Sequence, residues 1–297
     1  MLTEEELQNY RRAGKILAEI REEVRKVVKP GVKLLEIAEL AENLIVEKGA
    51  KPAFPCNVSV NEIAAHYSPP ADDARVIEEN DMVKVDLGAH VDGYIADTAF
   101  TVAFGEKQEM VQAVEKALEA AISVVKPGVD VGEIGKAVEE VAAASGFKPI
   151  KNLTGHSLAR WDLHAGITIP NVGETTGHIL AAGDVLAIEP FLTDGAGYVD
   201  DKNEAHIFRY LRDVPVRLRM SRGLLRDIKE NYRGLPFAER WLAKKMSKLR
   251  LELTLKELVG SGGLWPYYIL AERAGGKVAQ AEHTVIVTES GGEVITR

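Results

Sequence analysis

The chain has 297 residues, of which 46% are hydrophobic and 28% are charged, and its formal net charge is −8. This length and composition suit one or two domains with a sizeable core, and the acidic balance argues against DNA binding. The single cysteine, Cys56, excludes a disulfide scaffold and favours a cytoplasmic location. No run approaches the roughly 20 apolar residues of a membrane span, and no signal peptide is recognisable, so we expect no membrane partner.

The first predicted element is an amphipathic helix in which Thr3 and Glu6 form a capping box. It leads into the hexapeptide VVKPGV at 27–32, which occurs again at 124–129. After each copy a predicted helix follows and ends at a Gly-x-Lys-Pro sequence, a typical helix stop. The offset of 97 residues is longer than the period of a solenoid repeat, so the sequence predicts two half-domains related by duplication.

The first half then predicts a β-hairpin, MVKVDLG followed by YIADTAFTVAF, with a tight-turn signal at Asp92-Gly93. Asp86 lies on one arm and Asp97 on the other. Two registers are open: the aspartates lie directly opposite in one and are diagonal neighbours in the other. Both registers place the carboxylates on one face of the hairpin. Facing carboxylates destabilise a strand pair unless a cation joins them.

The second half repeats this acidic hairpin. By alignment of the two halves, Glu189 is the counterpart of Asp86, and Glu282 is the counterpart of Asp97. The acids are 11 residues apart in the first hairpin and 93 in the second, so the second hairpin holds 82 further residues. We expect residues 1–200 and 265–297 to form a catalytic domain. Residues 201–264 would form an inserted helical, winged-helix-like subdomain.

Four acids on apolar strands, with His156 and His164 nearby in the sequence GHSLARWDLHAG, form a pattern typical of a metal site. A buried carboxylate must be neutralised, paired or bound to a metal, although each acid alone also fits a solvent-facing strand position. An oxygen-rich site with a single imidazole suits Mn²⁺, Fe²⁺, Co²⁺ or Zn²⁺. Carboxylates able to bridge indicate two divalent metal ions about 3.5–4 Å apart.

Four segments of the sequence resemble those of methionine aminopeptidases, in particular the archaeal members of the type 2 class. These segments are KPAFPCNVSVNEIAAHYSP, DLGAHVDGYIADTAF, GHSLARWDLHAG and AEHTVIV. The resemblance implies an α+β pita-bread fold, in which two pseudo-symmetric half-domains contribute antiparallel strands and outer helices. It also implies a metal-dependent hydrolase, a metalloexopeptidase with five metal ligands: Asp86, Asp97, His156, Glu189 and Glu282.

The family resemblance also implies roles for individual residues. Asp97 and Glu282 would bridge two metals, and a water between the metals would attack the first peptide bond when the second residue is small. Glu189 would also carry a proton, and His66 and His164 would act on the substrate as catalytic residues. The methionine side chain would lie in a pocket formed by Phe54, Leu163, His206 and Tyr267. The alternative for His66 and His164 is a role as core histidines.

Two other functions stay open. Proline-specific peptidases share the fold, but they usually carry a separate N-terminal domain, whereas here the repeat begins within about 30 residues of the start. Non-enzymatic relatives of the fold lack the metal ligands, whereas this sequence has all five.

The predicted insertion is basic. Residues 209–257 contain 14 Lys and Arg and 6 Asp and Glu, a net charge of +8, so the rest of the chain carries −16. One interpretation is contact with ribosomal RNA near emerging nascent polypeptide N-termini, and the other is a solvated helical face.

Overall fold

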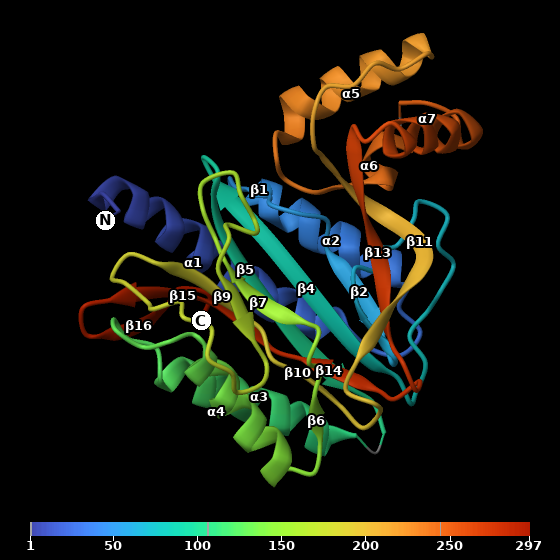
Figure 1. The fold of residues 1–297 in the computed structure, drawn as a ribbon. Helices are drawn as coiled ribbons and strands as arrows, with labels where there is room; N and C mark the ends of the chain where they lie inside the picture. The colour runs from blue at the N-terminus through green and yellow to red at the C-terminus, as the bar shows by residue number, and fades with distance from the viewer. Residues whose placement is uncertain (1, 106, 244) are drawn as a thin grey trace.

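The computed structural model describes residues 2–105, 107–243 and 245–297. Lys244, which contributes to the predicted charge of the insertion, lies outside these residues. Each half of the chain contributes a helix pair followed by strands (Figure 1). The first half comprises α1 (Glu4–Val27), α2 (Leu34–Glu47), β1 (Lys51–Pro52), β2 (Asn57–Val60), β3 (Ile63–Ala65), β4 (Met82–Val91) and β5 (Tyr94–Ala103).

The second half repeats the order of the first. Its elements are α3 (Gln108–Ser123), α4 (Gly132–Ala144), β6 (Lys148–Pro149), β7 (Thr154–Ser157), β8 (Thr168–Pro170), β9 (Val185–Ile188) and β10 (Phe191–Thr193). After the insertion the half is completed by β14 (Val278–Gln280), β15 (Glu282–Thr288) and β16 (Gly291–Val294).

The first helix begins as the sequence predicts. The Thr3 hydroxyl accepts a hydrogen bond from the Glu6 N–H, and the Glu6 carboxylate accepts one from the Thr3 N–H, which together form a capping box. One face of α1, with Leu17, Ile20 and Val24, is fully buried and packs on β4 and β5. The helix therefore fixes the strands that carry the first two acids.

The repeated hexapeptide forms the same turn in both halves. Gly31 and Gly128 have φ angles of +86° and +87°, a conformation that favours glycine. The Gly31 N–H donates to Ile77 O at 2.8 Å, and the Gly128 N–H donates to Leu180 O at 2.9 Å. Each turn thus ties its helix pair to the segment that enters the acidic hairpin, which explains why the sequence repeats.

The central sheet has the strand order β1-β4-β5-β15-β9-β7-β8, with β2 paired to β4 and β16 paired to β15. The β4–β5 hairpin closes at Val91 and Tyr94, and both turn residues, Asp92 and Gly93, have positive φ, as a type I′ turn requires. Of the two registers that the sequence leaves open, the structure therefore has the diagonal one. The counterpart of this hairpin is the antiparallel pair of β9 and β15.

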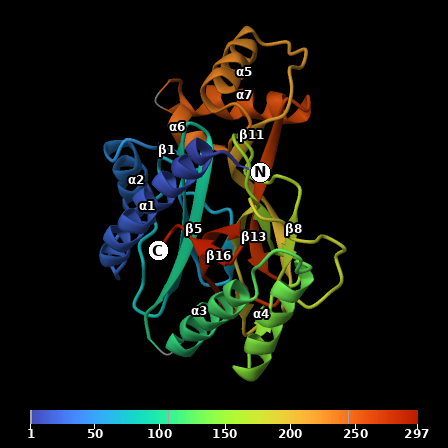
Figure 2. The same cartoon turned by 90° about the vertical axis from the view of Figure 1, so that its left-hand side faces the viewer.

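The four outer helices pack mainly against the strands of their own halves. Helix α1 contacts β4 and β5, and α2 contacts β1 and β2. Helix α3 contacts β9, β14 and β15 and also β5 of the first half, and α4 contacts β6 and β8. Figure 2 shows α1 and α2 beside β5 and, below them, α3 and α4. Two clusters of buried apolar side chains, one for each helix pair, form the core of the two halves.

The insertion stands at the top of Figure 1, away from α3 and α4. The long strands β11 (Val199–Tyr210) and β13 (Leu264–Glu272) pair with each other and lead into and out of it. Between them lie α5 (Arg219–Tyr232), β12 (Phe237–Ala238), α6 (Glu239–Ala243) and α7 (Lys248–Gly260), which have a hydrophobic core of their own. Within the described ranges of the chain, none of the helices has the length and apolar character needed to cross a bilayer.

Candidate metal centre and substrate cavity

Adjacent strands of the central sheet each contribute one predicted metal ligand. Along the order β4-β5-β15-β9-β7, the ligands are in turn Asp86, Asp97, Glu282, Glu189, which directly follows β9, and His156. Residues that are far apart in sequence therefore meet because the two acidic hairpins lie side by side at the centre of the sheet.

Threonine hydroxyl groups join the two central ligand strands where regular β pairing is short. The Asp97 N–H donates to Thr284 Oγ1 at 2.7 Å, and this hydroxyl donates back to the Asp97 carbonyl at 2.8 Å. The Thr98 hydroxyl donates to the Glu282 carbonyl at 2.8 Å. These bonds fix the backbone at both central acids and so limit how far their carboxylates can move.

The ligand atoms face one another. The candidate ligand atoms of Asp97, His156 and Glu282 all lie within 4.8 Å of one another. His156 Nε2 is 3.8 Å from Asp97 Oδ2 and 3.5 Å from Glu189 Oε1. The Gln280 amide donates to Glu189 Oε2 at 3.3 Å, which orients this carboxylate.

The electrostatics of the cluster call for a cation. Burial raises the pKa of Asp86 to about 7, and burial together with the neighbouring carboxylates raises the pKa of Asp97 and of Glu282 well above their ordinary values. Burial lowers the pKa of His156 to about 4, so its imidazole is a neutral ligand at physiological pH. Among the described residues, Asp86 Oδ1, Asp97 Oδ1 and Glu282 Oε1 are buried with no hydrogen-bond partner. Buried carboxylate oxygens without donors fit divalent metal ions.

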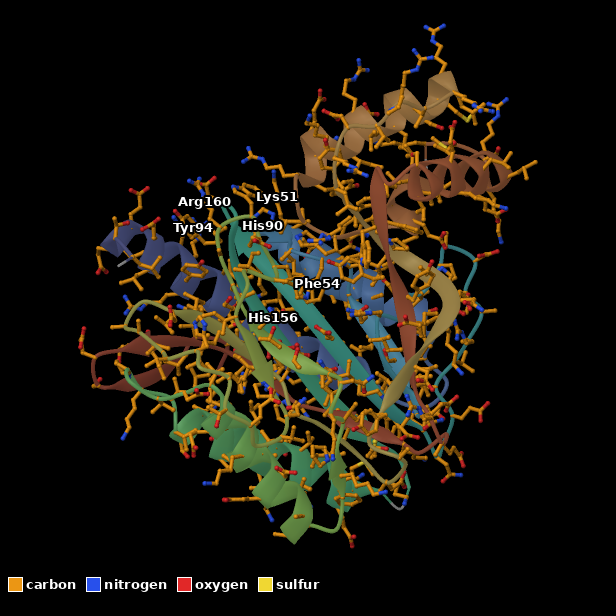
Figure 3. All side chains as sticks on the ribbon, viewed as in Figure 1. Lys51, Phe54, His90, Tyr94, His156 and Arg160 are labelled. Atoms are coloured by element: carbon orange, nitrogen blue, oxygen red, sulfur yellow. The ribbon has the colours of Figure 1, made fainter. Side chains whose placement is uncertain are left out.

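The ligands open into a cavity of about 290 Å³, which also takes in the predicted substrate residues Phe54, His66, Leu163, His164 and Tyr267. In Figure 3, His156 lies near the centre of the molecule with Phe54 above it, toward the insertion. Four of the five side chains come from the two halves, and Tyr267 lies on β13, the strand that leads out of the insertion.

The cavity has one apolar wall and one wall of imidazoles. Phe54 is buried with its ring against Gly88, where a Cβ atom would come within 2.1 Å of the ring. The Tyr267 ring lies edge-on to His66 at 5.3 Å and stacks on His164 at 6.1 Å, and His164 is 4.5 Å from the His156 ring. An aromatic row thus leads from β13 to the candidate metal ligands.

His206 does not line this cavity, whereas the adjacent Ile207 does. His206 lies where the β11–β13 register shifts between Ala205 and Ile207, so it is the extra residue of a bulge. A bulge redirects a side chain to the other face of a strand. His206 instead bonds two carboxylates, Nδ1 to Glu239 at 2.7 Å and Nε2 to Glu204 at 2.9 Å.

Sequence reasoning missed several lining residues, among them Ile207, Pro236 and Phe191. Phe191 follows the ligand Glu189 by two positions, and this spacing on an extended chain could have indicated it. Pro236 lies in the insertion and carries no local signal, because its place at the cavity depends on how the insertion folds back.

Comparison with known proteins agrees with the site. The sequence profile of metallopeptidase family M24 matches residues 8–289. The chain is 49% identical over 294 residues to the methionine aminopeptidase of Methanothermobacter thermautotrophicus, covering 98% of both chains. It is 51% identical over 287 residues to that of Thermococcus onnurineus, covering 96% of this chain and 97% of the relative.

The fold is also similar to that of a solved structure. The crystal structure of the methionine aminopeptidase from Thermotoga maritima superposes with a TM-score of 0.73 at 27% identity, covering 100% of this chain and 98% of that chain. The predicted α+β pita-bread fold of two pseudo-symmetric halves is thereby confirmed.

Proposed function

The chain belongs to metallopeptidase family M24, and from this premise we propose that it removes the N-terminal methionine from polypeptides whose second residue is small. The observation that carries the proposal is the cavity itself, in which a set of metal ligands faces an apolar wall. The identity of about one half with methionine aminopeptidases, over nearly the whole chain, supports it.

Two divalent cations, Co²⁺, Mn²⁺, Fe²⁺ or Zn²⁺, suit a donor set of carboxylates and one imidazole. Asp97 and Glu282 are central in this set and would bridge the two ions. Asp86 would complete the ligands of one ion, and His156 and Glu189 those of the other. When bound, such a pair lowers the pKa of a water molecule to near neutrality and polarises a peptide carbonyl.

The histidines would hold the substrate in complementary ways. His66 Nδ1 lies 3.1 Å from the Tyr268 carbonyl oxygen, which can only accept, so Nδ1 carries the proton. Partial burial lowers the pKa of His66, and the neutral ring then offers Nε2 as an acceptor for a substrate N–H. His164, exposed to the cavity, would donate to the developing oxyanion, and Glu189 would deliver the proton to the departing amine.

The apolar wall sets the side-chain preference. Phe54, Leu163 and Tyr267 offer mainly carbon surface, and burial of each methylene of an unbranched side chain contributes about 0.8 kcal/mol. The cavity of about 290 Å³ is at the small end of ligand pockets, so it leaves little room for a bulky second residue.

We also propose that the substrates are nascent chains in the cytoplasm and that the insertion contacts the ribosome. Helix α5 carries Arg222, Arg226 and Lys229, and Arg233 directly follows it; all four line one groove of about 520 Å³ on the face of the insertion, together with Asp213 and Glu230. The three basic residues of the helix recur at helical spacing, so their charges project together, and such a row suits a run of phosphates.

The activity test is hydrolysis of Met-Ala-Ser, Met-Lys-Ser and an Ala-Pro dipeptide, with Co²⁺ or Mn²⁺ and again after chelation. We expect metal-dependent cleavage of Met-Ala-Ser and little cleavage of the other two peptides. Preferred cleavage of the Ala-Pro bond would identify a proline-specific peptidase. No cleavage by metal-loaded protein would favour a binding protein without enzymatic activity.

A further inference from the structure

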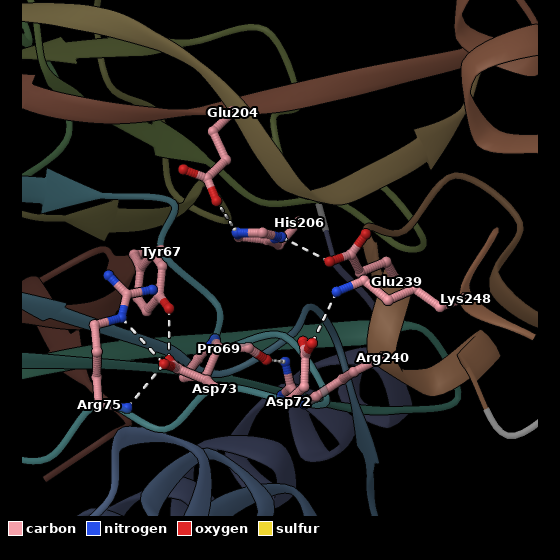
Figure 4. Close-up of polar contacts among 10 residues, drawn as sticks. All are labelled: Tyr67, Pro69, Asp72, Asp73, Arg75, Glu204, His206, Glu239, Arg240 and Lys248. Atoms are coloured by element: carbon pink, nitrogen blue, oxygen red, sulfur yellow. Dashed lines mark hydrogen bonds and ion pairs between the residues drawn. The ribbon is translucent and has the colours of Figure 1, made fainter. Parts of the chain in front are cut away.

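Three consecutive side chains of the short helix α6 make polar contacts close to the walls of the cavity, and two of them, Arg240 and Trp241, reach the first half of the chain. Glu239 bonds His206, the neighbour of the lining residue Ile207, and Trp241 Nε1 donates to Glu42 Oε2 at 2.8 Å. Arg240, between them, points into the catalytic domain, where Figure 4 shows it beside Pro69. Helix α6 is therefore the main polar attachment of the insertion to the first half of the chain.

Arg240 bridges two separate segments of that half. Its Nη2 donates to Glu42 on α2, and its Nη1 donates to the Ser68 hydroxyl at 2.5 Å and to the Pro69 carbonyl at 3.2 Å. The side chains of Arg240 and Glu42 are only 4% and 11% exposed. At this depth a charge pair holds its geometry tightly, because neither partner can exchange its contacts for water.

The two residues that Arg240 bridges also hold Cys56 at both of its backbone polar groups. The Cys56 N–H donates to Glu42 Oε1 at 3.0 Å, and the Cys56 carbonyl accepts from the Ser68 hydroxyl at 2.9 Å. The Ser68 hydroxyl thus accepts from Arg240 and gives its single proton to Cys56, so it relays the network from one to the other.

The segments held in this way are the walls of the cavity. Cys56 lies between Phe54 and Asn57, which both line the cavity, and Ser68 follows His66 by two residues. His66 has a φ of +65°, a strained conformation for a residue other than glycine, and such a conformation persists only when its surroundings fix it. The bond from Arg240 to Ser68 and Pro69 supplies part of that support.

We propose that Arg240 is a positioning residue, through which the insertion sets the places of Phe54 and His66 without touching the substrate. The inference deepens the proposed methionine aminopeptidase function and rests on it for its kinetic test. The insertion is then part of the specificity of the enzyme, separate from any role of its basic surface.

The test compares two variants of the network with a matched control in metal-loaded protein. Ser68→Ala removes one hydroxyl, and Arg240→Lys keeps the charge but has a single nitrogen, which cannot take the places of both Nη1 and Nη2. The control is Lys248→Ala, which breaks an exposed ion pair between the insertion and Asp72, in the same loop as Ser68, at 2.8 Å. Circular dichroism establishes that each protein is folded before the measurement.

For Met-Ala-Ser, we expect both network variants to raise KM about tenfold, because a displaced Phe54 weakens binding common to ground and transition states. Lys248→Ala should keep the wild-type KM. A purely structural role for Arg240 would instead reduce the apparent kcat with the folded fraction and leave KM unchanged. Unchanged KM in both Ser68→Ala and Arg240→Lys would overturn the proposal.

Labelling of Cys56 gives a readout that does not need activity. Cys56 is the single cysteine and is 1% exposed, so a thiol reagent should react slowly with the wild type and faster with the two network variants. The wild type could cleave no methionine peptide while Cys56 still reacts faster in the two variants. That result would contradict the proposed function but would support the role of Arg240 in holding the cavity wall. Wild-type labelling rates in both variants, with an active enzyme, would show that Arg240 does not hold this wall.

Discussion

At the residue scale, we expect the chemistry to depend most on Asp97. Its backbone is held on both sides by Thr284, its Oδ1 is buried with no hydrogen-bond partner among the described residues, and it lies between ligands from both halves. We expect Asp97→Ala to lower kcat/KM by at least about 10³, since metal activation of water is the main source of rate. The measurement is peptide hydrolysis together with elemental analysis. Near-normal turnover with unchanged metal content would contradict the two-metal assignment.

His206 allows a prediction of pH dependence. Burial lowers the pKa of His206, but the hydrogen bond to Glu239 and the charges of Glu239 and Glu204 outweigh burial, so the net pKa is raised. Asp72 and Asp73 are also close enough to interact with the charge of His206. Because the folded-state pKa is raised, the stabilisation is complete below the ordinary value of about 6.5 and is lost as pH rises through the folded value.

The test of this prediction is urea unfolding of wild type and His206→Gln at pH 6 and pH 9. We expect the substitution to lower the free energy of unfolding by about 1 kcal/mol more at pH 6 than at pH 9. The difference is kept this small because Glu204 is 61% exposed, so solvent screens its charge. Equal losses at both pH values would mean that the imidazole is uncharged in the folded protein.

At the element scale, the repeat and the acidic hairpins could be predicted because their signals are local. The Pro-Gly turns, the helix stops and the Asp92-Gly93 turn each depend on a few neighbouring residues. The register of the first hairpin stayed open, because it depends on Asp92 adopting a positive φ, which aspartate tolerates but does not require. The sequence alone therefore indicated the face shared by Asp86 and Asp97 but not their diagonal relation.

The contribution of the insertion to the cavity could not be predicted from the sequence. Strict alternation along β11 gives no reason to prefer Ile207 over His206, and a bulge in the pairing with β13 decides which of them faces the cavity. The position of Pro236 likewise depends on contacts between segments more than 150 residues apart, such as that of Arg240 with Ser68. Long-range packing of this kind leaves no pattern in the local sequence.

Helix α5 carries the prediction about the ribosome. Arg222→Glu with Arg226→Glu reverses two exposed charges of its basic row, and we expect weaker co-sedimentation with ribosomes and a salt dependence reduced by about two phosphate contacts. Cleavage of Met-Ala-Ser should be unchanged. The matched control is Lys29→Glu with Lys126→Glu, which makes the same change in net charge at exposed lysines of the repeated turns. Equal loss of binding in both double variants would show only a response to total charge.

At the scale of the whole molecule, the ligand set divides between the two halves. Asp86 and Asp97 come from the first half, and His156, Glu189 and Glu282 come from the second. A cation held by this set joins the halves, whereas the buried carboxylates without it repel one another across the same boundary. The free energy of unfolding should therefore depend on metal more strongly than on any single side chain of the site.

The division of the ligand set predicts that metal stabilises the wild type. Metal at about 100 times its Kd should add about 2.7 kcal/mol to the unfolding free energy of the wild type, because only the folded chain assembles the site.

The effect of Asp97→Asn on stability should change sign when metal is added. This substitution keeps the shape of the side chain but removes one of the clustered charges. At pH 8 and after chelation, we expect this variant to be more stable than the wild type, since burial and the neighbouring Asp86 and Glu189 disfavour the ionised Asp97 carboxylate. With Mn²⁺ restored, the order should reverse, because the variant lacks a carboxylate that we propose as a bridging ligand. Thermal unfolding of both proteins with and without Mn²⁺ tests this directly, and a variant that is less stable in both conditions would show that Asp97 serves the fold independently of the metal.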